Sequence, residues 1–276
     1  MPRAIWSGAI SFGLVSIPVK LFSAVSRKTV RFNQLDSKTN SRVKQKRVNA
    51  EGDEVPYEQI VKGYEVTKDT YVIVTEDELA MLAPKASRMI EITDFVSEAE
   101  IDPVFYDSAY FLVPDELARK SYVLLTRALQ ESGRVAIATF IMRTKQYLVA
   151  IRPVDERLMM STMVYADEVV DGEHIPGLED MEGIEVTDAE LAMAGQLIDS
   201  LTGDFEPSKY QDSYREQVLD LVESKASGEV RAIEAPAAAD EAAVVDLLAA
   251  LEASVEAAKE ARKGGAEQPD AEAKSA

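Results

Sequence analysis

A glycine pair near the N-terminus is the first pattern that could take part in chemistry. Gly8 and Gly13 have the spacing of a phosphate-binding loop. In such a loop a lysine and then a serine or threonine follow the second glycine, to reach phosphate and magnesium. Here Leu14 and Val15 occupy those two positions. The sequence therefore excludes a phosphate loop of this type.

Acidic clusters are the next candidates. Glu76-Asp77-Glu78 and Asp167-Glu168 contain adjacent carboxylates, which general acid–base catalysis can use. The chain has 49 Asp and Glu residues, so such pairs arise by chance. Acidic residues also stabilise the N-termini of helices. We therefore interpret both clusters as helix-start or turn residues.

Metal-binding and nucleophilic residues are scarce. The chain has no cysteine, and its one histidine, His174, stands in a glycine- and proline-containing stretch that predicts a loop. Thiolate and multi-histidine metal sites are therefore excluded, and a Ser-His-Asp triad is disfavoured. We expect no catalytic residue, no metal and no cofactor.

Charge is distributed unevenly along the chain, whose net charge is −19. Residues 1–50 hold ten Lys and Arg against the single acid Asp36, a local charge of +9 that leaves −28 for the remainder. A second stretch, 119–157, carries eight cations against three acids. Such segregation can concentrate positive potential on one surface of an acidic protein. The alternative is that solvated strand faces simply carry these charges.

Strand signals dominate the first two thirds of the chain, where β-branched and aromatic residues alternate with turn-forming clusters. Trp6 and Phe12, with Ile5, Ile10 and Leu14, are interpreted as core residues of the opening strands, and stacking on a base is the alternative. A polar connection at 143–146 predicts a hairpin. The pattern predicts a strand-rich α+β fold with a barrel or twisted sandwich. The predicted later strands are 17–25, 70–75, 89–96, 110–113, 135–142, 147–154 and 158–165.

Helical patterns interrupt the strands and then replace them. Capping boxes at Thr75 and Thr187, each with a glutamate three residues later, predict helix starts. Apolar spacing predicts helices over 120–131 and 188–202, and a further one from about Tyr214 to Gly228. We predict a β-barrel core over residues 1–185 and a helical arm over 186–228.

The C-terminal region has a different composition. Residues 229–243 are rich in Ala, Glu and Pro, as in a linker, and 264–276 are predicted to be disordered. Between them, 244–263 predicts a helix with a narrow apolar stripe. This stripe either docks on its own domain or waits for the groove of a partner, and we favour the partner. The stripe consists of Val244, Leu248, Leu251 and Val255.

The longest purely apolar run, Val135 to Met142, is much shorter than the roughly 20 residues of a membrane span. The N-terminus shows no hydrophobic region of a signal peptide. We therefore expect a soluble, intracellular protein.

The N-terminal segment from Arg3 to Ala24 closely resembles the start of the prokaryotic Ku proteins, which bind DNA ends in non-homologous end joining. Further segments resemble the same family in its order, so the resemblance covers residues 3 to about 228. Residues 246–259 are similar to the short C-terminal segment of bacterial members. The further matching segments are 57–65, 121–125, 193–201 and 205–216.

The resemblance implies a homodimeric ring built on a β-barrel, with a basic channel for double-stranded DNA ends and recruitment of an ATP-dependent DNA ligase. It also implies a cytoplasmic, nucleoid-associated protein without enzymatic activity. Two features depart from the family. Some relatives carry cysteines, and with them zinc, where Val48 to Asp53 stand here, and many have a Lys-rich tail where this chain is acidic.

Binding of DNA regardless of sequence needs phosphate contacts rather than base contacts, so lysines and arginines suffice. The alternative function is an acidic interaction protein or DNA mimic that occupies a nucleic-acid-binding partner. Our first candidates for phosphate contacts are Lys20, Arg27, Lys28, Arg31, Arg42, Lys44, Lys46 and Arg47. The second set is Arg134, Arg143, Lys145 and Arg152.

Overall fold

The computed structural model describes residues 3–82, 88–142, 145–172, 175–178, 183–228 and 250–257. The chain divides into two compact units, residues 1–171 and 172–276. The finer division predicted from the sequence, with its boundaries at 185, 228, 243 and 263, remains a prediction.

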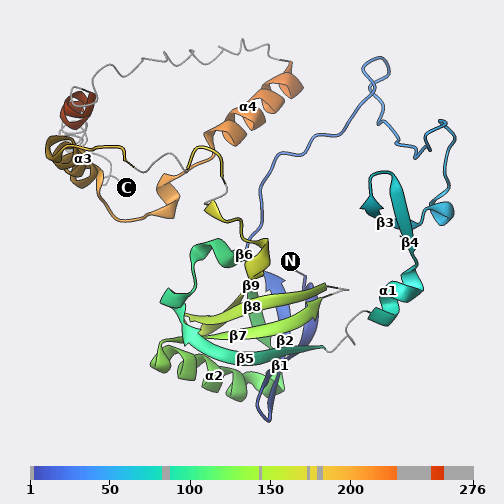
Figure 1. Cartoon of the computed structure of the whole chain (residues 1–276), viewed down its shortest axis with the longest axis horizontal. Helices are drawn as coiled ribbons and strands as arrows, with labels where there is room; N and C mark the ends of the chain where they lie inside the picture. Colours follow the sequence, from blue (N-terminus) through green and yellow to red (C-terminus); the bar gives the residue numbers. More distant parts are fainter. Residues whose placement is uncertain are drawn as a thin grey trace, which may run out of the picture. The chain divides into compact units, whose positions relative to one another are not determined.

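Seven strands of the first unit form a closed barrel in the order β1-β2-β6-β9-β8-β7-β5 (Figure 1). Neighbouring strands pair antiparallel except β1 and β5, which pair in parallel. The predicted strand-rich α+β fold with a barrel is thus confirmed. The strands are β1 (Trp6–Phe12), β2 (Val15–Ser23), β5 (Met89–Ser97), β6 (Tyr106–Pro114), β7 (Arg134–Met142), β8 (Lys145–Val154) and β9 (Arg157–Met163).

The parallel pairing of β1 with β5 closes the barrel. It joins Ala9 to Met89, Ile10 to Ile90 and Ser11 to Glu91. The indole Nε1 of Trp6 on β1 donates to the carbonyl of Ile141 on β7 at 3.2 Å. Because β5 lies between β1 and β7, this hydrogen bond links the two strands that flank β5. Strands β2 and β5 are antiparallel to each other, because β1 pairs antiparallel with one and parallel with the other. The chain therefore leaves β2 and enters β5 at the same end of the barrel.

Helix α2 (Arg119–Ser132) lies across one opening of the barrel. It contacts β2 on one wall and β7 and β8 on the opposite wall. Tyr122, Leu125 and Leu129 are buried in the same core cluster as the barrel interior. The Tyr122 hydroxyl donates to the Leu112 carbonyl at 2.8 Å and accepts from the Leu158 amide at 2.6 Å. These bonds tie the helix to β6 and β9.

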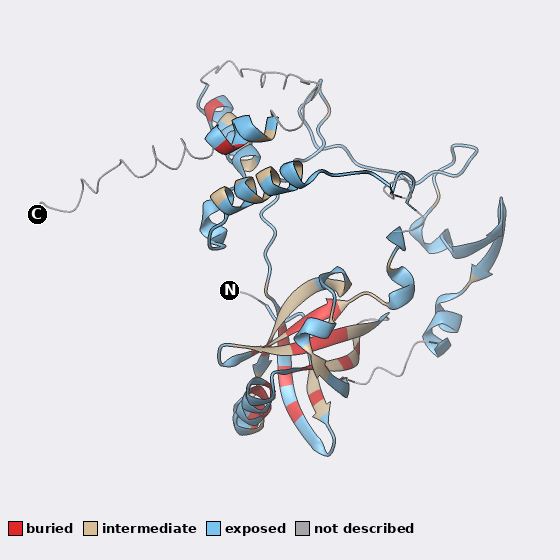
Figure 2. Cartoon of the chain, turned by 60° about the vertical axis from the view of Figure 1, so that its left-hand side comes forward, coloured by how far each residue is buried: buried red, intermediate tan, exposed pale blue. Residues whose placement is uncertain are grey.

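An insertion, residues 25–82, leaves the barrel after β2. It contains the two-stranded sheet of β3 (Lys62–Thr67) and β4 (Thr70–Val74), followed by helix α1 (Glu76–Leu82). No residue of the insertion is buried, whereas burial is concentrated in the barrel and α2 (Figure 2). The barrel therefore holds a packed core, and the insertion contributes nothing to it.

The second unit contains the helices α3 (Asp188–Leu201) and α4 (Ser213–Ser227). Thr187 caps α3 through a reciprocal pair with Glu190, as predicted, and Gly228 ends α4 with a left-handed φ of 81°. Residues 250–257 are also helical.

Short 3-10 turns occur in both units. They lie at Tyr57–Gln59, Glu98–Glu100, Pro103–Phe105, Glu116–Ala118, Ala166–Glu168 and Pro207–Lys209.

Three details differ from the sequence-based predictions. Ile10 is buried and Trp6 packs against the core, but Ile5 and Phe12 are exposed and Leu14 is fully exposed. Leu14 stands in the tight β1–β2 turn, where no interior is available. The assignment of Ile5, Phe12 and Leu14 to the core was therefore wrong. Strand β3 was not predicted, and Lys145 and Gln146 belong to β8 rather than to a connection.

Within the described residues, no helix is long and apolar enough to cross a membrane.

Gly8 offers a test of the barrel closure. A Cβ at this position would collide with the Arg88 carbonyl oxygen and the Trp6 ring. Overpacking of this kind costs about 1–3 kcal/mol, so Gly8→Ala should lower the free energy of unfolding by that amount in urea denaturation followed by circular dichroism. Gly195→Ala is the control, because nothing lies within 4 Å of the added Cβ there. Equal stability of the two variants would contradict the tight closure.

Candidate nucleic-acid interface

The basic N-terminal segment forms two small loops rather than regular structure. In the first loop, the amide of Val43 donates to the carbonyl of Gln34 at 3.1 Å, and Leu35 bridges Arg42. In the second, the amide of Val55 donates to the carbonyl of Arg47 at 2.9 Å. Local backbone bonds hold these loops, and no residue from 26 to 55 is buried.

Five of the first candidates carry uncompensated charge. They are exposed, and none forms an ion pair within the described part of the chain. Asp36 is the one acidic residue between residues 26 and 47. Its carboxylate accepts from the Thr39 hydroxyl at 2.6 Å and the Lys38 amide at 3.0 Å. These hydrogen bonds lower the pKa of Asp36, and its carboxylate is bonded to these two residues rather than to a cation. The five residues are Arg27, Lys28, Arg31, Arg42 and Lys44.

Three other candidates are engaged with acids. Lys20 lies 2.9 Å from Asp115, and Lys46 lies 2.6 Å from Glu54. Arg152 lies 3.6 Å from Glu98 and is about one-third exposed. A phosphate would have to compete with these carboxylates, although exposed ion pairs contribute only about 0–1 kcal/mol.

The remaining candidates have aromatic or apolar neighbours. The Arg47 guanidinium lies 5.3 Å from the centre of the Tyr57 ring, and the Lys145 ammonium lies 5.4 Å from that of Tyr147. Cation–π contact leaves the hydrogen-bonding groups of these cations open. Arg134 is exposed at the start of β7, where it lines an apolar pocket. Arg143 lies outside the described residues.

The acidic clusters act as helix-start residues. Glu78 accepts from both the amide and the hydroxyl of Thr75, which closes the predicted capping box of α1 and lowers the pKa of Glu78. Asp167 and Glu168 lie in a 3-10 turn. The described residues contain no group of His, Cys, Asp and Glu that could hold a metal ion. His174 lies outside the described residues.

The apolar stripe of the C-terminal segment is described only in part. Val244 and Leu248 lie outside the described residues. Leu251 is half-buried and Val255 is buried. The described half of the stripe is therefore covered, so a partner would have to displace whatever covers it.

Sequence reasoning missed the pocket beside Arg134. Its walls include Phe12, Phe95 and Leu124, all exposed. One signal was available: Val123, Leu124 and Leu125 are consecutive, and the narrow core-facing stripe of an amphipathic helix cannot take all three. The excess apolar surface of α2 could have been read from that run.

The family model described as "Ku70/Ku80 beta-barrel domain" matches residues 11–193. The chain is 51% identical over 263 residues to the non-homologous end joining protein Ku of Anaeromyxobacter sp., covering 94% of this chain and 87% of that protein. It is 45% identical to the protein of the same name from Heliobacterium modesticaldum, covering 95% and 94%. It is 42% identical to the protein of the same name from Mycobacterium tuberculosis, and the match covers 94% of this chain and 97% of that protein.

The three unpaired cations that precede the first loop allow a test of the interface. If Arg27, Lys28 and Arg31 each neutralise a phosphate, their joint replacement by Ala should make the slope of log K against log salt less steep by about 2.7, from about 0.9 per contact. Equilibrium titrations of a short DNA duplex at several salt concentrations measure this slope. An unchanged slope would remove these residues from the interface.

The control for this test changes the net charge equally. Lys209, Arg215 and Lys225 lie in the second unit, on the 3-10 turn before α4 and on α4 itself. Their joint replacement by Ala should leave the slope unchanged. A flattening as large as that of the first triple variant would show that overall charge, rather than contact, controls binding.

Proposed function

Because the chain belongs to the prokaryotic Ku family, which acts in non-homologous end joining and is not catalytic, we propose that it binds the ends of double-stranded DNA without regard to sequence. The binding form is a ring-shaped homodimer that protects and aligns the broken ends. It presents them to an ATP-dependent DNA ligase. DNA repair by end joining is thus the process, and end recognition is the contribution of this chain.

One observation carries the proposal: a long insertion without any buried residue, fixed at both ends on a rigid barrel and rich in unpaired cations. Eight Lys and Arg lie between residues 26 and 47, against Asp36 alone. Cations on an extended, exposed backbone can follow the phosphates of a duplex, and such contacts carry no sequence information.

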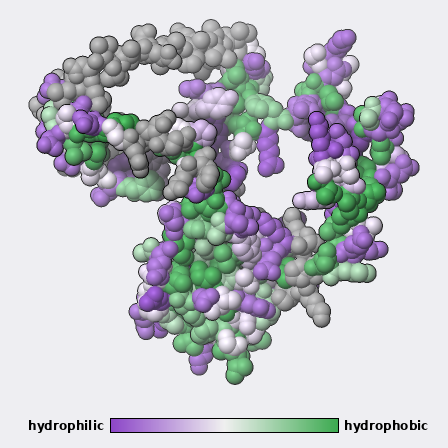
Figure 3. Space-filling view, viewed as in Figure 1, coloured by the Kyte–Doolittle hydropathy of each residue, from purple (hydrophilic) through white to green (hydrophobic). Residues whose placement is uncertain are grey.

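The same insertion supports the dimer. An isolated two-stranded hairpin is marginally stable at best in water. In β3 and β4, Tyr64, Tyr71, Val72 and Ile73 are all more than half exposed, and both faces of the hairpin carry apolar side chains. Figure 3 shows this hydrophobic surface among the polar residues of the insertion. Burial against a second copy would supply the packing that the hairpin lacks.

A closed ring explains selectivity for ends. A duplex can enter such a ring only by threading its terminus, so a circular duplex has no point of entry. Once threaded, the protein leaves only by sliding back to the end, even where each phosphate contact is weak. Topology, rather than a dedicated pocket for the terminal nucleotide, then distinguishes an end from an internal site.

Ligase recruitment is assigned to the stripe of Val244, Leu248, Leu251 and Val255, which presents apolar side chains on a segment rich in acids. An amphipathic helix of this type fits a hydrophobic groove on another protein. Leu251 is half-buried and Val255 is buried in this structure. Recruitment therefore requires that these two side chains leave their present contacts and bind the ligase surface.

Binding to linear and relaxed circular DNA of the same sequence tests the threading. In a gel-shift titration at physiological salt, the linear form should be retarded and the circle should not. Cutting the circle once should restore retardation. Equal retardation of both forms would contradict the ring, and retardation of neither would favour the acidic DNA mimic instead.

The oligomeric state tests the second copy. Light scattering should give twice the mass of one chain for the protein alone, and at least the mass of two chains plus one duplex when a short blunt duplex is bound. Val72→Asp and Ile73→Asp place a charge on opposite faces of the hairpin, and at least one should shift the mass toward a single chain. Lys68→Asp, in the turn of the same hairpin, is the control. A single-chain mass for the unaltered protein bound to DNA would contradict the proposal.

A further inference from the structure

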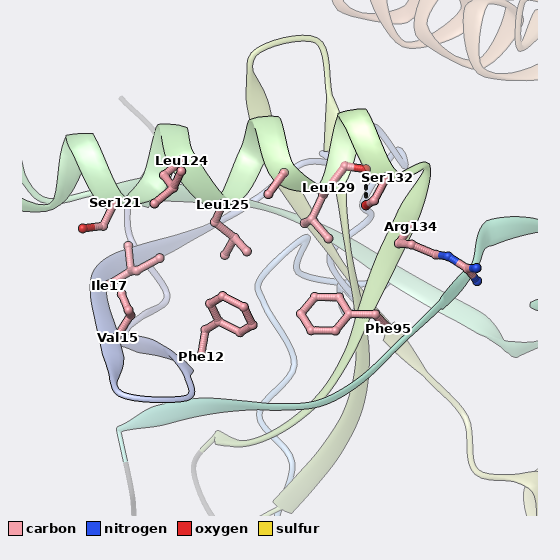
Figure 4. A pocket seen from close by; sticks show the side chains of 11 residues that line it. Phe12, Val15, Ile17, Phe95, Ser121, Leu124, Leu125, Leu129, Ser132 and Arg134 are labelled. Atoms are coloured by element: carbon pink, nitrogen blue, oxygen red, sulfur yellow. Dashed lines mark hydrogen bonds between the residues drawn. The ribbon is translucent and has the colours of Figure 1, made fainter.

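An apolar groove runs along α2. Leu124, Leu125 and Leu129 form one wall, and Phe12 and Val15 of the β1–β2 hairpin, with Phe95 of β5, form the other (Figure 4). The two phenylalanine rings meet edge to face, with centroids 5.5 Å apart. The cavity measures about 350 Å³, which lies within the usual range of binding pockets, about 300–1,000 Å³.

The walls of the groove are not sealed by the rest of the barrel. Leu124 is 69% exposed, and Phe12 and Phe95 are 43% and 41% exposed. Leu14, in the hairpin turn between Phe12 and Val15, is fully exposed. Contiguous exposed apolar surface of this kind marks a binding site more often than isolated exposed residues do.

The groove has the dimensions of a helix. Its lining on α2 extends from Ser121 to Ser132, about 16 Å at a rise of about 1.5 Å per residue. A partner helix of about three turns would match this length, and its apolar residues would recur along the groove as they do on α2.

The rim of the groove is basic. Arg134 stands at the end of the groove beside Ser132 (Figure 4). Lys120 and Arg127 lie four residues before and three residues after Leu124, so they are its neighbours on the helix surface. All three are exposed, and none forms an ion pair within the described part of the chain. Glu131 is the single acid of α2.

We propose that this groove docks an acidic amphipathic helix of a partner protein, with apolar side chains between the two phenylalanines and α2 and carboxylates on Arg134, Lys120 and Arg127. Charge complementarity selects this occupant, because a basic rim repels a basic helix and attracts an acidic one. Arg134, which the sequence suggested as a phosphate contact, thereby binds a carboxylate of the partner. The site is independent of DNA binding and of the C-terminal stripe.

The test uses the full chain and two synthetic helical peptides of four turns. Both carry Leu and Phe at positions i, i+3, i+4 and i+7, and the remaining positions are Glu in one peptide and Lys in the other. Fluorescence anisotropy of labelled peptides should show the acidic peptide binding about tenfold more tightly than the basic one at low salt, and high salt should reduce this preference.

Matched variants locate the binding. Leu124→Glu should weaken the acidic peptide by about tenfold, as for a central interface residue, whereas Val123→Glu, also exposed on α2 but outside the groove, should not. Arg134→Glu should abolish the preference for the acidic peptide. Phe95→Lys repeats the test on β5, so the inference remains testable where Leu124→Glu fails to fold.

Three outcomes would overturn the proposal. The first is equal binding of both peptides, or binding insensitive to Leu124→Glu and Phe95→Lys. The second is a change in the mass of the protein caused by these variants, which would make the groove an interface between copies of this chain. The third is tighter binding of a synthetic peptide with the sequence of residues 240–262, which would make the occupant a segment of this chain. Retained end binding by Leu124→Glu and Phe95→Lys separates all three from failure of the proposed function.

Discussion

The parallel pairing of β1 with β5 is the constraint on which the rest of the first unit depends. Without it the seven strands would be an open sheet with two unpaired edges, and β1 would expose a row of backbone donors and acceptors. The pairing involves three residue pairs, Ala9–Met89, Ile10–Ile90 and Ser11–Glu91. The insertion lies between β2 and β5 in the sequence, and β1 pairs with both strands. The two ends of the insertion are therefore attached to strands that flank β1 in the barrel. The absence of a side chain at Gly8 allows the approach.

The first unit separates stability from binding. Burial is concentrated in the barrel and α2, where the Tyr122 hydroxyl is bonded to two strands at once. Burial raises the pKa of this hydroxyl. The insertion, in contrast, holds no buried residue and exposes cations and apolar side chains. Mutations in the insertion should therefore alter binding with little effect on the barrel, which makes the two functions separable by experiment.

Much of this architecture follows from local sequence signals. The hairpin of β7 and β8, the capping boxes of Thr75 and Thr187, and the glycine that ends α4 depend on short-range chemistry, so they were predictable. The exposure of Phe12 and Leu14 was not, because strand patterns do not reveal where a hairpin projects beyond the core. The pairing of individual cations with acids was equally hidden. Lys20 meets Asp115 and Arg152 meets Glu98 only through the folded barrel. Sequence could identify the basic segment but not which members are free.

The way the insertion is anchored has a mechanical consequence. The chain leaves β2 and enters β5 at one end of the barrel, and the two strands flank β1. Ladder hydrogen bonds lie across the strand direction, so tension applied to the insertion along the strand direction would strain many of these bonds together. A sheet loaded in this shearing direction resists far more force than one peeled open bond by bond. If the insertion binds DNA as proposed, a pull on the DNA along this direction would be resisted by many ladder hydrogen bonds of the barrel at once.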